Sequence, residues 1–220
     1  MDQDLKNSIL KTGTSLVGLV CKDGVVLAAD RKMTLGGQLI AHKDFHKIYK
    51  VNGYLLVSIA GQVSDAQMAL KVIAAQLKLK ELKSKQRPNV KEAASFISSF
   101  YFQNIRQPSM IPAIVASLVA GINPDGTAEL YNISPDGAIK DIKNYDADGS
   151  GMMFIWGLLE RQYKKDLSVK EGINLAIESI KSSSERDVAS GSGIDVWTLN
   201  KEGINHVVDQ EIISEFKDRK

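Results

Sequence analysis

Two hairpins dominate the pattern of apolar and polar positions near the start of the chain. Apolar residues fill most of 16–21 and 25–29, and Asp23-Gly24 between them is a strong turn signal. The second of these strands is apolar on both faces, so we expect other layers to cover it from both sides. Asn52-Gly53 marks a second hairpin, between strands at 48–51 and 54–57.

A helical period replaces this pattern after residue 62. Apolar residues recur at steps of three and four from Val63 to Leu77, which predicts a long helix ending near Lys83. After a breaker at 87–89, a second apolar stripe predicts a helix from Val90 to about residue 107.

The order of the remaining elements indicates the fold class. They are strands at 113–122, 129–133 and 138–142, helices at about 152–165 and 169–185, and strands near 194–200 and 204–208. Segregated runs of strands and helices favour an α+β protein over alternating βαβ units. A four-layer αββα sandwich, with two sheets face to face and helices outside, fits this order. No linker or repeat divides residues 14–220, so we expect one domain after a short tail, residues 1–13.

Composition narrows the classes of function. The 220 residues are 44% hydrophobic and 25% charged, with a formal net charge of +2, as in ordinary globular proteins. Acidic and basic residues are mixed, which indicates neither a nucleic-acid surface nor a polybasic membrane tail. The longest apolar run, 110–122, contains Pro112 and is too short to span a bilayer, and the polar N-terminus is unlike a signal peptide. We expect a cytoplasmic protein without nucleic-acid or membrane partners.

Cysteine and histidine add little chemistry. Cys21 is the one cysteine, so no intramolecular disulfide is possible, and its place at a strand end indicates a core residue. The three histidines, His42, His46 and His206, have no partner at a recognisable ligand spacing. The sequence therefore predicts no metal site and no cofactor.

Four local features have both an ordinary and a functional interpretation. Gly13-Thr14 lies where the tail meets a strand, Asp30 ends an apolar strand, residues 148–151 precede an apolar helix, and 185–193 follow another. Taken singly, each has an ordinary interpretation. Gly13-Thr14 is a common dipeptide, and Asp30 fits a strand end in contact with solvent. Residues 148–151 fit a helix cap, and residues 185–193 fit a polar loop after a helix. If Asp30 is buried, however, its carboxylate needs a cationic partner or hydrogen bonds.

Together these features lie within blocks that resemble the proteasome β-subunit family, in an archaeal-like form. Six blocks share the family's order and spacing: Val17-Gly18, Lys22–Arg31, His46–Tyr49, Ile59–Gln67, Gly149–Gly151 and Glu185–Gly191. The similarity runs from Thr14 to about Ile213. It implies the four-layer sandwich of the N-terminal-nucleophile hydrolases and the activity of a threonine endopeptidase.

The resemblance implies a role for each matching residue. Thr14 matches the threonine that becomes the mature N-terminus, after self-cleavage between Gly13 and Thr14 removes residues 1–13 as a propeptide. Asp30 and Lys47 match a buried acid–lysine pair beside that threonine. Ser150, Asp187 and Ser190 match groups that hold and tune its amine and hydroxyl, and Gly61 matches the glycine whose backbone N–H serves the oxyanion.

Acid–base chemistry explains why cleavage and activation would be one event. A threonine hydroxyl needs a base to accept its proton. At about pH 7 roughly one ordinary lysine in 2,500 is neutral, against roughly one α-amine in ten, so the freed α-amine of Thr14 is the better base. While Gly13 is attached, the Thr14 nitrogen is an amide and cannot act as a base. Lys47, held charged by Asp30, would lower neighbouring pKa values.

The resemblance also implies a pocket before the scissile bond. The residues at the family's pocket positions are Met33, Phe45, Tyr49, Ile59 and Val63. They are largely apolar and include no acid, which predicts cleavage after large hydrophobic residues, although some could be plain core residues. Ser15 and Leu16 depart from the family, in which threonines often follow the nucleophile.

Partners and alternatives also follow from the resemblance. It implies stacked seven-membered rings shared with proteasome α-type and other β subunits, an ATPase regulator reached through the α rings, and unfolded polypeptide as substrate. One alternative is a catalytically silent β subunit, although such a chain would lack the threonine, lysine or aspartate. The other is an amidase of the same fold or a simpler bacterial-type peptidase, which the long helices and the 185–191 block disfavour.

Overall fold

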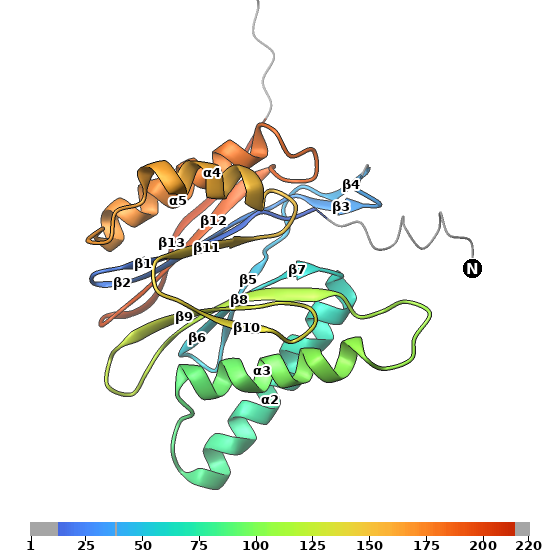
Figure 1. Ribbon diagram of the computed structural model, residues 1–220, viewed down its shortest axis with the longest axis vertical. Coiled ribbons are helices and arrows are strands. Elements are labelled where there is room, and N and C mark those ends of the chain that lie inside the picture. The colour runs from blue at the N-terminus through green and yellow to red at the C-terminus, as the bar shows by residue number, and fades with distance from the viewer. Residues whose placement is uncertain (1–12, 38, 214–220) are drawn as a thin grey trace, which may run out of the picture.

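The computed structural model describes residues 13–37 and 39–213, which form four layers (Figure 1). Two antiparallel sheets lie face to face, and a pair of helices covers the outer side of each. This is the predicted αββα sandwich, and the α+β class is confirmed. The predicted tail, residues 1–13, falls outside the described residues except for Gly13.

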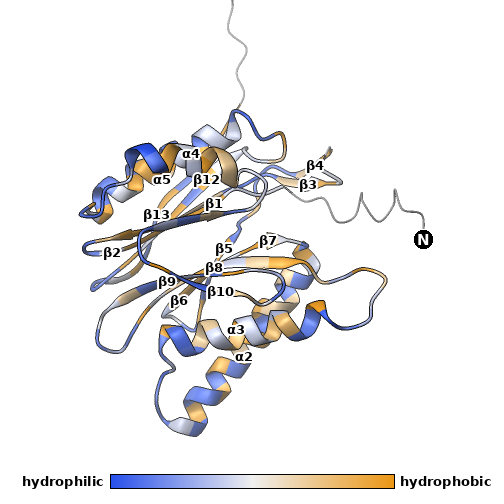
Figure 2. Cartoon of the chain, in the orientation of Figure 1, coloured by the Kyte–Doolittle hydropathy of each residue, from blue (hydrophilic) through white to orange (hydrophobic). Residues whose placement is uncertain are grey.

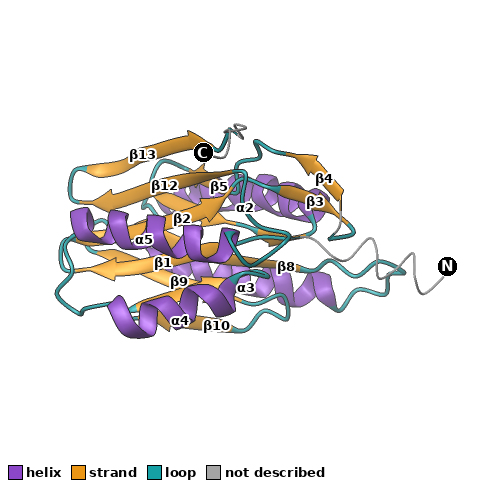
Figure 3. Cartoon of the chain, turned by 90° about the horizontal axis from the view of Figure 1, so that it is seen from above, coloured by secondary structure: helices purple, strands orange, loops and turns teal. Residues whose placement is uncertain are grey.

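The first sheet carries the N-terminal hairpin at its centre. Its strand order is β11-β1-β2-β12-β13. The bounds are β1 Leu16–Cys21, β2 Gly24–Asp30, β11 Tyr145–Asp148, β12 Gly193–Asn200 and β13 Gly203–Glu211. Helices α4 (Met152–Gln162) and α5 (Val169–Ser184) cover its outer face, as the view from above shows for α5 over β1 and β2 (Figure 3).

The second sheet has the order β10-β9-β8-β6-β5, with β7 paired to β8. Its strands are β5 Ile48–Val51, β6 Leu55–Ser58, β7 Ala60–Gly61, β8 Val115–Ile122, β9 Ala128–Ile133 and β10 Ile139–Ile142. Helices α2 (Val63–Ser84) and α3 (Val90–Ile105) cover it, and a separate hairpin is formed by β3 (Met33–Leu35) and β4 (Leu39–His42).

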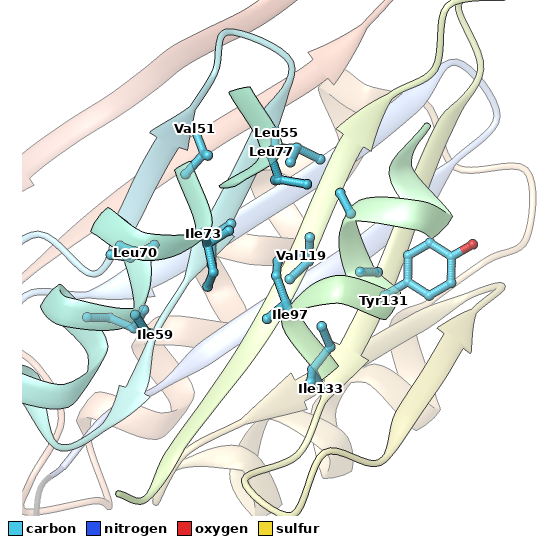
Figure 4. Packing of buried hydrophobic residues seen from close by; sticks show 14 of the residues in the cluster. Val51, Leu55, Ile59, Leu70, Ile73, Leu77, Ile97, Val119, Tyr131 and Ile133 are labelled. Atoms are coloured by element: carbon cyan, nitrogen blue, oxygen red, sulfur yellow. The ribbon is translucent and has the colours of Figure 1, made fainter. Parts of the chain in front are cut away.

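Three apolar clusters hold the layers together. One lies between the second sheet and its helices and includes Ile73 of α2 and Ile97 of α3, the latter beside Val119 of β8 (Figure 4). Another lies between the first sheet and α4 and α5, and the third lies between the sheets. Hydrophobic and hydrophilic colours alternate along the covering helices, as expected when one side packs on a sheet (Figure 2).

Strand β2 shows why this arrangement needs a strand that is apolar throughout. Val26 and Ala28 belong to the cluster under α4 and α5, whereas Leu27 and Ala29 belong to the cluster between the sheets. Successive side chains of a strand point to opposite faces, so a strand covered on both sides is apolar at every position. The sequence-based expectation for this strand is confirmed.

The predicted helices are all present, and their observed bounds differ from the expected ones by at most three residues. The capping box predicted at Ser168 and Glu171 is also present. Three features were missed: the hairpin β3–β4, the two-residue strand β7, and β11. The last was missed because Tyr145–Asp148 alternates a charged residue with small or aromatic ones and gives no apolar run. No helix in the described part of the chain is long and apolar enough to cross a bilayer.

Candidate active site

Thr14 lies two residues before the start of β1 and is buried. Its backbone N–H donates to the Ser150 hydroxyl at 3.2 Å, and its carbonyl oxygen accepts from the Gly151 N–H at 3.2 Å. The turn that joins β11 to α4 therefore holds the Thr14 backbone on both sides.

Asp30 and Lys47 form a buried ion pair beside Thr14. The Lys47 Nζ donates to Asp30 Oδ1 at 2.6 Å and to the Gly13 carbonyl oxygen at 3.2 Å. Asp30 ends β2 in one sheet, and Lys47 immediately precedes β5 in the other. The burial expected for an acid with a cationic partner is found here, so the solvated strand end is wrong for Asp30.

Backbone donors complete the shell of Asp30. Its Oδ1 accepts from the Ser15 N–H at 2.8 Å, and its Oδ2 accepts from the N–H groups of Lys32 at 3.1 Å and Gly191 at 2.9 Å. With Lys47, four donors satisfy this carboxylate, which is how a buried charge is tolerated. Burial lowers the pKa of the Lys47 ammonium, and the nearby Asp30 carboxylate opposes that shift.

Two chains of hydroxyl groups meet at the Asp187 carboxylate. Ser150 donates to Asp187 Oδ2 at 2.5 Å, and Ser190 donates to the same oxygen at 2.6 Å. The Ser15 and Ser190 hydroxyl oxygens are 2.7 Å apart, and since the Ser190 proton is directed to Asp187, Ser15 is the donor between them. Ser150, Asp187 and Ser190 are thus brought together around Thr14, as the resemblance implied.

An apolar pocket opens beside the Gly13–Thr14 bond. Its lining residues are Gly13, Thr14, Met33, Thr34, Phe45, Lys47, Ile59, Gly61 and Val63. Four of the five residues expected to form the pocket are present. Tyr49 is not among them, because its ring packs against the cluster under α2 and α3 while its hydroxyl donates to the His46 carbonyl at 2.8 Å.

Gly61 lies in the pocket wall with a backbone that only glycine adopts readily. Its φ is +113°, and a Cβ there would lie 2.1 Å from the Ile114 carbonyl oxygen. The short pairing of β7 with β8 therefore requires glycine at this place. Gly61 and Thr14 line the same pocket.

Two further residues, Thr34 and Ser15, make hydrogen bonds in the site that the sequence does not predict. Thr34 is buried in β3, and its hydroxyl accepts the Gly13 N–H at 3.0 Å. Ser15 stands out in the sequence only as a departure from the family, yet its hydroxyl reaches Ser190. The signal that could have found Ser15 is a polar residue next to Thr14 and directly before a buried strand.

The remaining sequence-based expectations concern cysteine and metals. Cys21 is buried at the end of β1, as predicted, and burial raises its pKa to about 12. His206, Asp195 and Asp209 lie close enough together to offer ligand atoms to a metal, a proximity that sequence spacing did not reveal. The Arg31 guanidinium lies among the same carboxylates, so a cation is already present there.

Comparison with known proteins identifies the family. A family model described as "Proteasome subunit" matches residues 10–199. The chain belongs to the proteasome subunit family. It is 36% identical over 204 residues to a proteasome subunit beta of Methanobrevibacter smithii, covering 93% of this chain and 95% of that protein.

Other archaeal β subunits give the same result. The subunit of Methanocaldococcus jannaschii is 35% identical over 200 residues, covering 91% of this chain and 87% of that protein. The subunit of Methanocaldococcus vulcanius is 33% identical over 200 residues, with the same coverage of both chains. This similarity places the chain among β-type subunits of the proteasome core and confirms the resemblance to archaeal members. A role in proteasomal protein degradation follows from membership in the family.

Proposed function

We propose that this chain is an active threonine endopeptidase subunit of the proteasome core, with Thr14 as nucleophile after self-cleavage behind Gly13. One observation carries the proposal. The Gly13 carbonyl oxygen accepts hydrogen bonds from both the Thr14 hydroxyl, at 2.6 Å, and the Lys47 ammonium, at 3.2 Å. The nucleophile and a cation therefore meet at the one carbonyl that must be attacked for the chain to mature.

Self-cleavage uses this contact directly. The Thr14 hydroxyl gives up its proton as its oxygen attacks the Gly13 carbonyl carbon, and this proton ends on the Thr14 nitrogen as the peptide bond breaks. Residues 1–13 are then left on the Thr14 oxygen as an ester. Lys47 stabilises the charge that develops on the carbonyl oxygen. Water then hydrolyses the ester, which restores the hydroxyl and leaves a free amine on Thr14.

The hydroxyl network is prepared for that amine. In the intact chain the Thr14 nitrogen donates to Ser150, which itself donates to Asp187. The amine released at the same place keeps these neighbours, so it can take the hydroxyl proton when a substrate carbonyl is attacked. The Gly61 N–H, at the pocket wall, would stabilise the substrate oxyanion. The leaving amine of the substrate takes the proton back, and water hydrolyses the second ester.

The pocket supports a preference for large apolar side chains before the scissile bond. Met33, Phe45, Ile59 and Val63 line it together with Thr34. No acidic side chain lies among the lining residues, so a basic substrate side chain would lose its hydration without gaining a partner.

A catalytically silent subunit is the alternative within the same family. The groups whose loss would mark such a subunit, namely Thr14, Asp30 and Lys47, are all present, and the ion pair is formed with a fully bonded carboxylate. We therefore favour an active subunit.

The family supports further proposals about the setting. We infer that residues 14–220 act as one domain after a propeptide of residues 1–13, in stacked heptameric rings with α-type and β subunits in the cytoplasm. An ATPase regulator on the α rings would deliver unfolded polypeptide. The names of the relatives, all proteasome β subunits, support assembly into a proteasome core. The α rings, the heptameric stacking and the ATPase regulator are what the family resemblance implies.

Co-expression with a proteasome α-type subunit tests the activity. Assembled particles should hydrolyse fluorogenic peptides that carry a large apolar residue before the reporter, and Thr14→Ala should abolish that turnover. Thr127→Ala, in the turn between β8 and β9, is the matched control and should keep full turnover. Wild-type particles without turnover would favour the silent subunit.

A further inference from the structure

A second charged cluster is formed by residues next in sequence to the Asp30–Lys47 pair and to Ile194, which pairs with Asp30 across the strands. At its centre is Asp195 of β12, whose side chain is 0% exposed. Its Oδ2 lies 2.8 Å from His46 Nδ1 and its Oδ1 lies 3.1 Å from His206 Nε2. The Arg31 guanidinium completes the cluster, 3.8 Å from Asp195. Both oxygens of this buried carboxylate are thus held by imidazoles.

The cluster joins the two sheets at the place where the catalytic pair joins them. Asp195 pairs across the strands with Ala29, which belongs to the apolar cluster between the sheets. Arg31 directly follows Asp30, and His46 directly precedes Lys47. The bonds from His46 to Asp195 and to Arg31 therefore run between the sheets in parallel with the bond from Lys47 to Asp30.

The hydrogen-bond partners assign the protonation of His46. Arg31 NH2 lies 2.9 Å from His46 Nε2, and a guanidinium can only donate. His46 Nε2 is therefore an acceptor, and the ring proton lies on Nδ1, which donates to Asp195. The neutral imidazole is held at both nitrogens, so its orientation is fixed although 47% of the side chain is exposed.

The same arrangement disfavours a bound metal. Arg31 forms ion pairs with Asp209 and with Asp44, the latter at 2.5 Å, in addition to its contact with Asp195. A permanent cation thus already neutralises the acids that would have to hold a metal ion. The cluster therefore links the two sheets by hydrogen bonds and ion pairs and is not a metal-binding site.

We propose that His46 is a positioning residue for the Asp30–Lys47 pair and acts through the Asp195 carboxylate and Arg31. By fixing the backbone just before Lys47 against the end of β2, it sets the distance from the Lys47 ammonium to the carbonyl under attack. Small displacements of such groups cost large factors in rate. This role rests on the proposed peptidase activity of Thr14.

Three variants in assembled particles test the role. His46→Leu removes both hydrogen bonds, while His46→Asn keeps a donor at the position of Nδ1 for Asp195. His42→Leu is the matched control, because His42 is an exposed histidine four residues earlier in β4. We expect His46→Leu to lower kcat about tenfold or more with KM little changed, His46→Asn to regain most of the loss, and His42→Leu to match wild type.

Unchanged kcat in His46→Leu, or no recovery in His46→Asn, overturns the proposal. Amide hydrogen exchange of the same particles tests the positioning role of His46 independently of the peptidase activity proposed for Thr14. His46→Leu should speed exchange around residues 30–32 and 46–48 together, relative to His42→Leu, whether or not the particles turn over substrate. If wild type is inactive, the peptidase proposal fails, and equal exchange in the two leucine variants also overturns the positioning role.

Discussion

The Asp30 carboxylate and the Lys47 ammonium lie 2.6 Å apart, although Asp30 ends a strand of one sheet and Lys47 immediately precedes a strand of the other. Their ion pair crosses between the sheets next to the Gly13 carbonyl, so stability and the proposed chemistry depend on the same contact. The two partners are not equivalent, however. Asp30 also satisfies three backbone N–H groups, whereas Lys47 donates only to Asp30 and Gly13 among the described hydrogen bonds.

This asymmetry predicts unequal losses of stability. Lys47→Met leaves Asp30 with three backbone donors. Asp30→Ala instead leaves those three N–H groups and the buried Lys47 ammonium without their acceptor. Each unsatisfied buried group costs about 1–3 kcal/mol, so Asp30→Ala should lower the free energy of unfolding by several kcal/mol more than Lys47→Met. Urea denaturation of the isolated chains measures the difference. Both variants should lose nearly all peptidase activity in particles, and equal stability losses would contradict the hydrogen-bond assignment.

Gly13 should be required for self-cleavage because of its contact with the loop after α5. A Cβ at Gly13 would lie 2.0 Å from the Ala189 Cβ and 2.3 Å from its carbonyl oxygen. Gly13→Ala should therefore displace the Gly13 carbonyl from Lys47 and slow removal of residues 1–13 about tenfold or more.

Intact mass against time after assembly measures this rate. Gly157→Ala is the matched control, since a Cβ at that position in α4 meets nothing within 4 Å. Removal at the wild-type rate in Gly13→Ala would show that the close approach to Ala189 does not constrain the bond.

Val63 offers a test of the pocket because it lines the cavity at the first position of α2. An acid is well tolerated in the first turn of a helix, so Val63→Asp should fold. Its charge should lower turnover of peptides with a large apolar residue before the scissile bond about tenfold, and favour basic ones. Ser64→Asp, exposed in the same turn, should leave the preference unchanged. An unaltered preference in Val63→Asp would place the pocket elsewhere.

Cys21 tests the packing of β1 against α5. A Cβ added to Gly172 of α5 would lie 2.7 Å from the Cys21 sulfur, and burial raises the thiol pKa from 9.0 to about 12. A raised pKa means that the folded state disfavours the thiolate. Its contribution to stability is therefore complete below pH 9 and is lost as the pH rises toward about 12. At about pH 8, iodoacetamide should alkylate the urea-unfolded chain but not the native one; equal rates would contradict the packing.

The sequence predicted those parts of the fold that depend on local signals. Turn dipeptides such as Asp23-Gly24, the capping box at Ser168 and the apolar stripes of α2 and α3 each act over a few residues, and the structure contains all of them. Strands β3 and β4 are short, and Leu35 and Leu39 are exposed, so no alternating pattern marks them.

From the sequence, only those residues of the candidate site that lie in the family's motifs could be predicted. The resemblance placed Thr14, Asp30, Lys47 and Asp187 at separate points of the chain, and the sheets bring them together. Nothing local could reveal that His46 and His206 meet on Asp195, because that contact depends on the register of β12 with β2 and β13. Tyr49 does not line the pocket, because side chains alternate along β5: Ile48 belongs to the cluster between the sheets, and Tyr49 packs against the cluster under α2 and α3.

The mass of this chain in assembled, peptide-hydrolysing particles tests the central claim most directly. Wild-type chains should have lost residues 1–13 and begin with Thr14, whereas Thr14→Ala chains in matched particles should keep all 220 residues. If active particles hold only full-length chains, or if Thr14→Ala is trimmed as fully as wild type, then Thr14 does not release its own amine and the account is wrong.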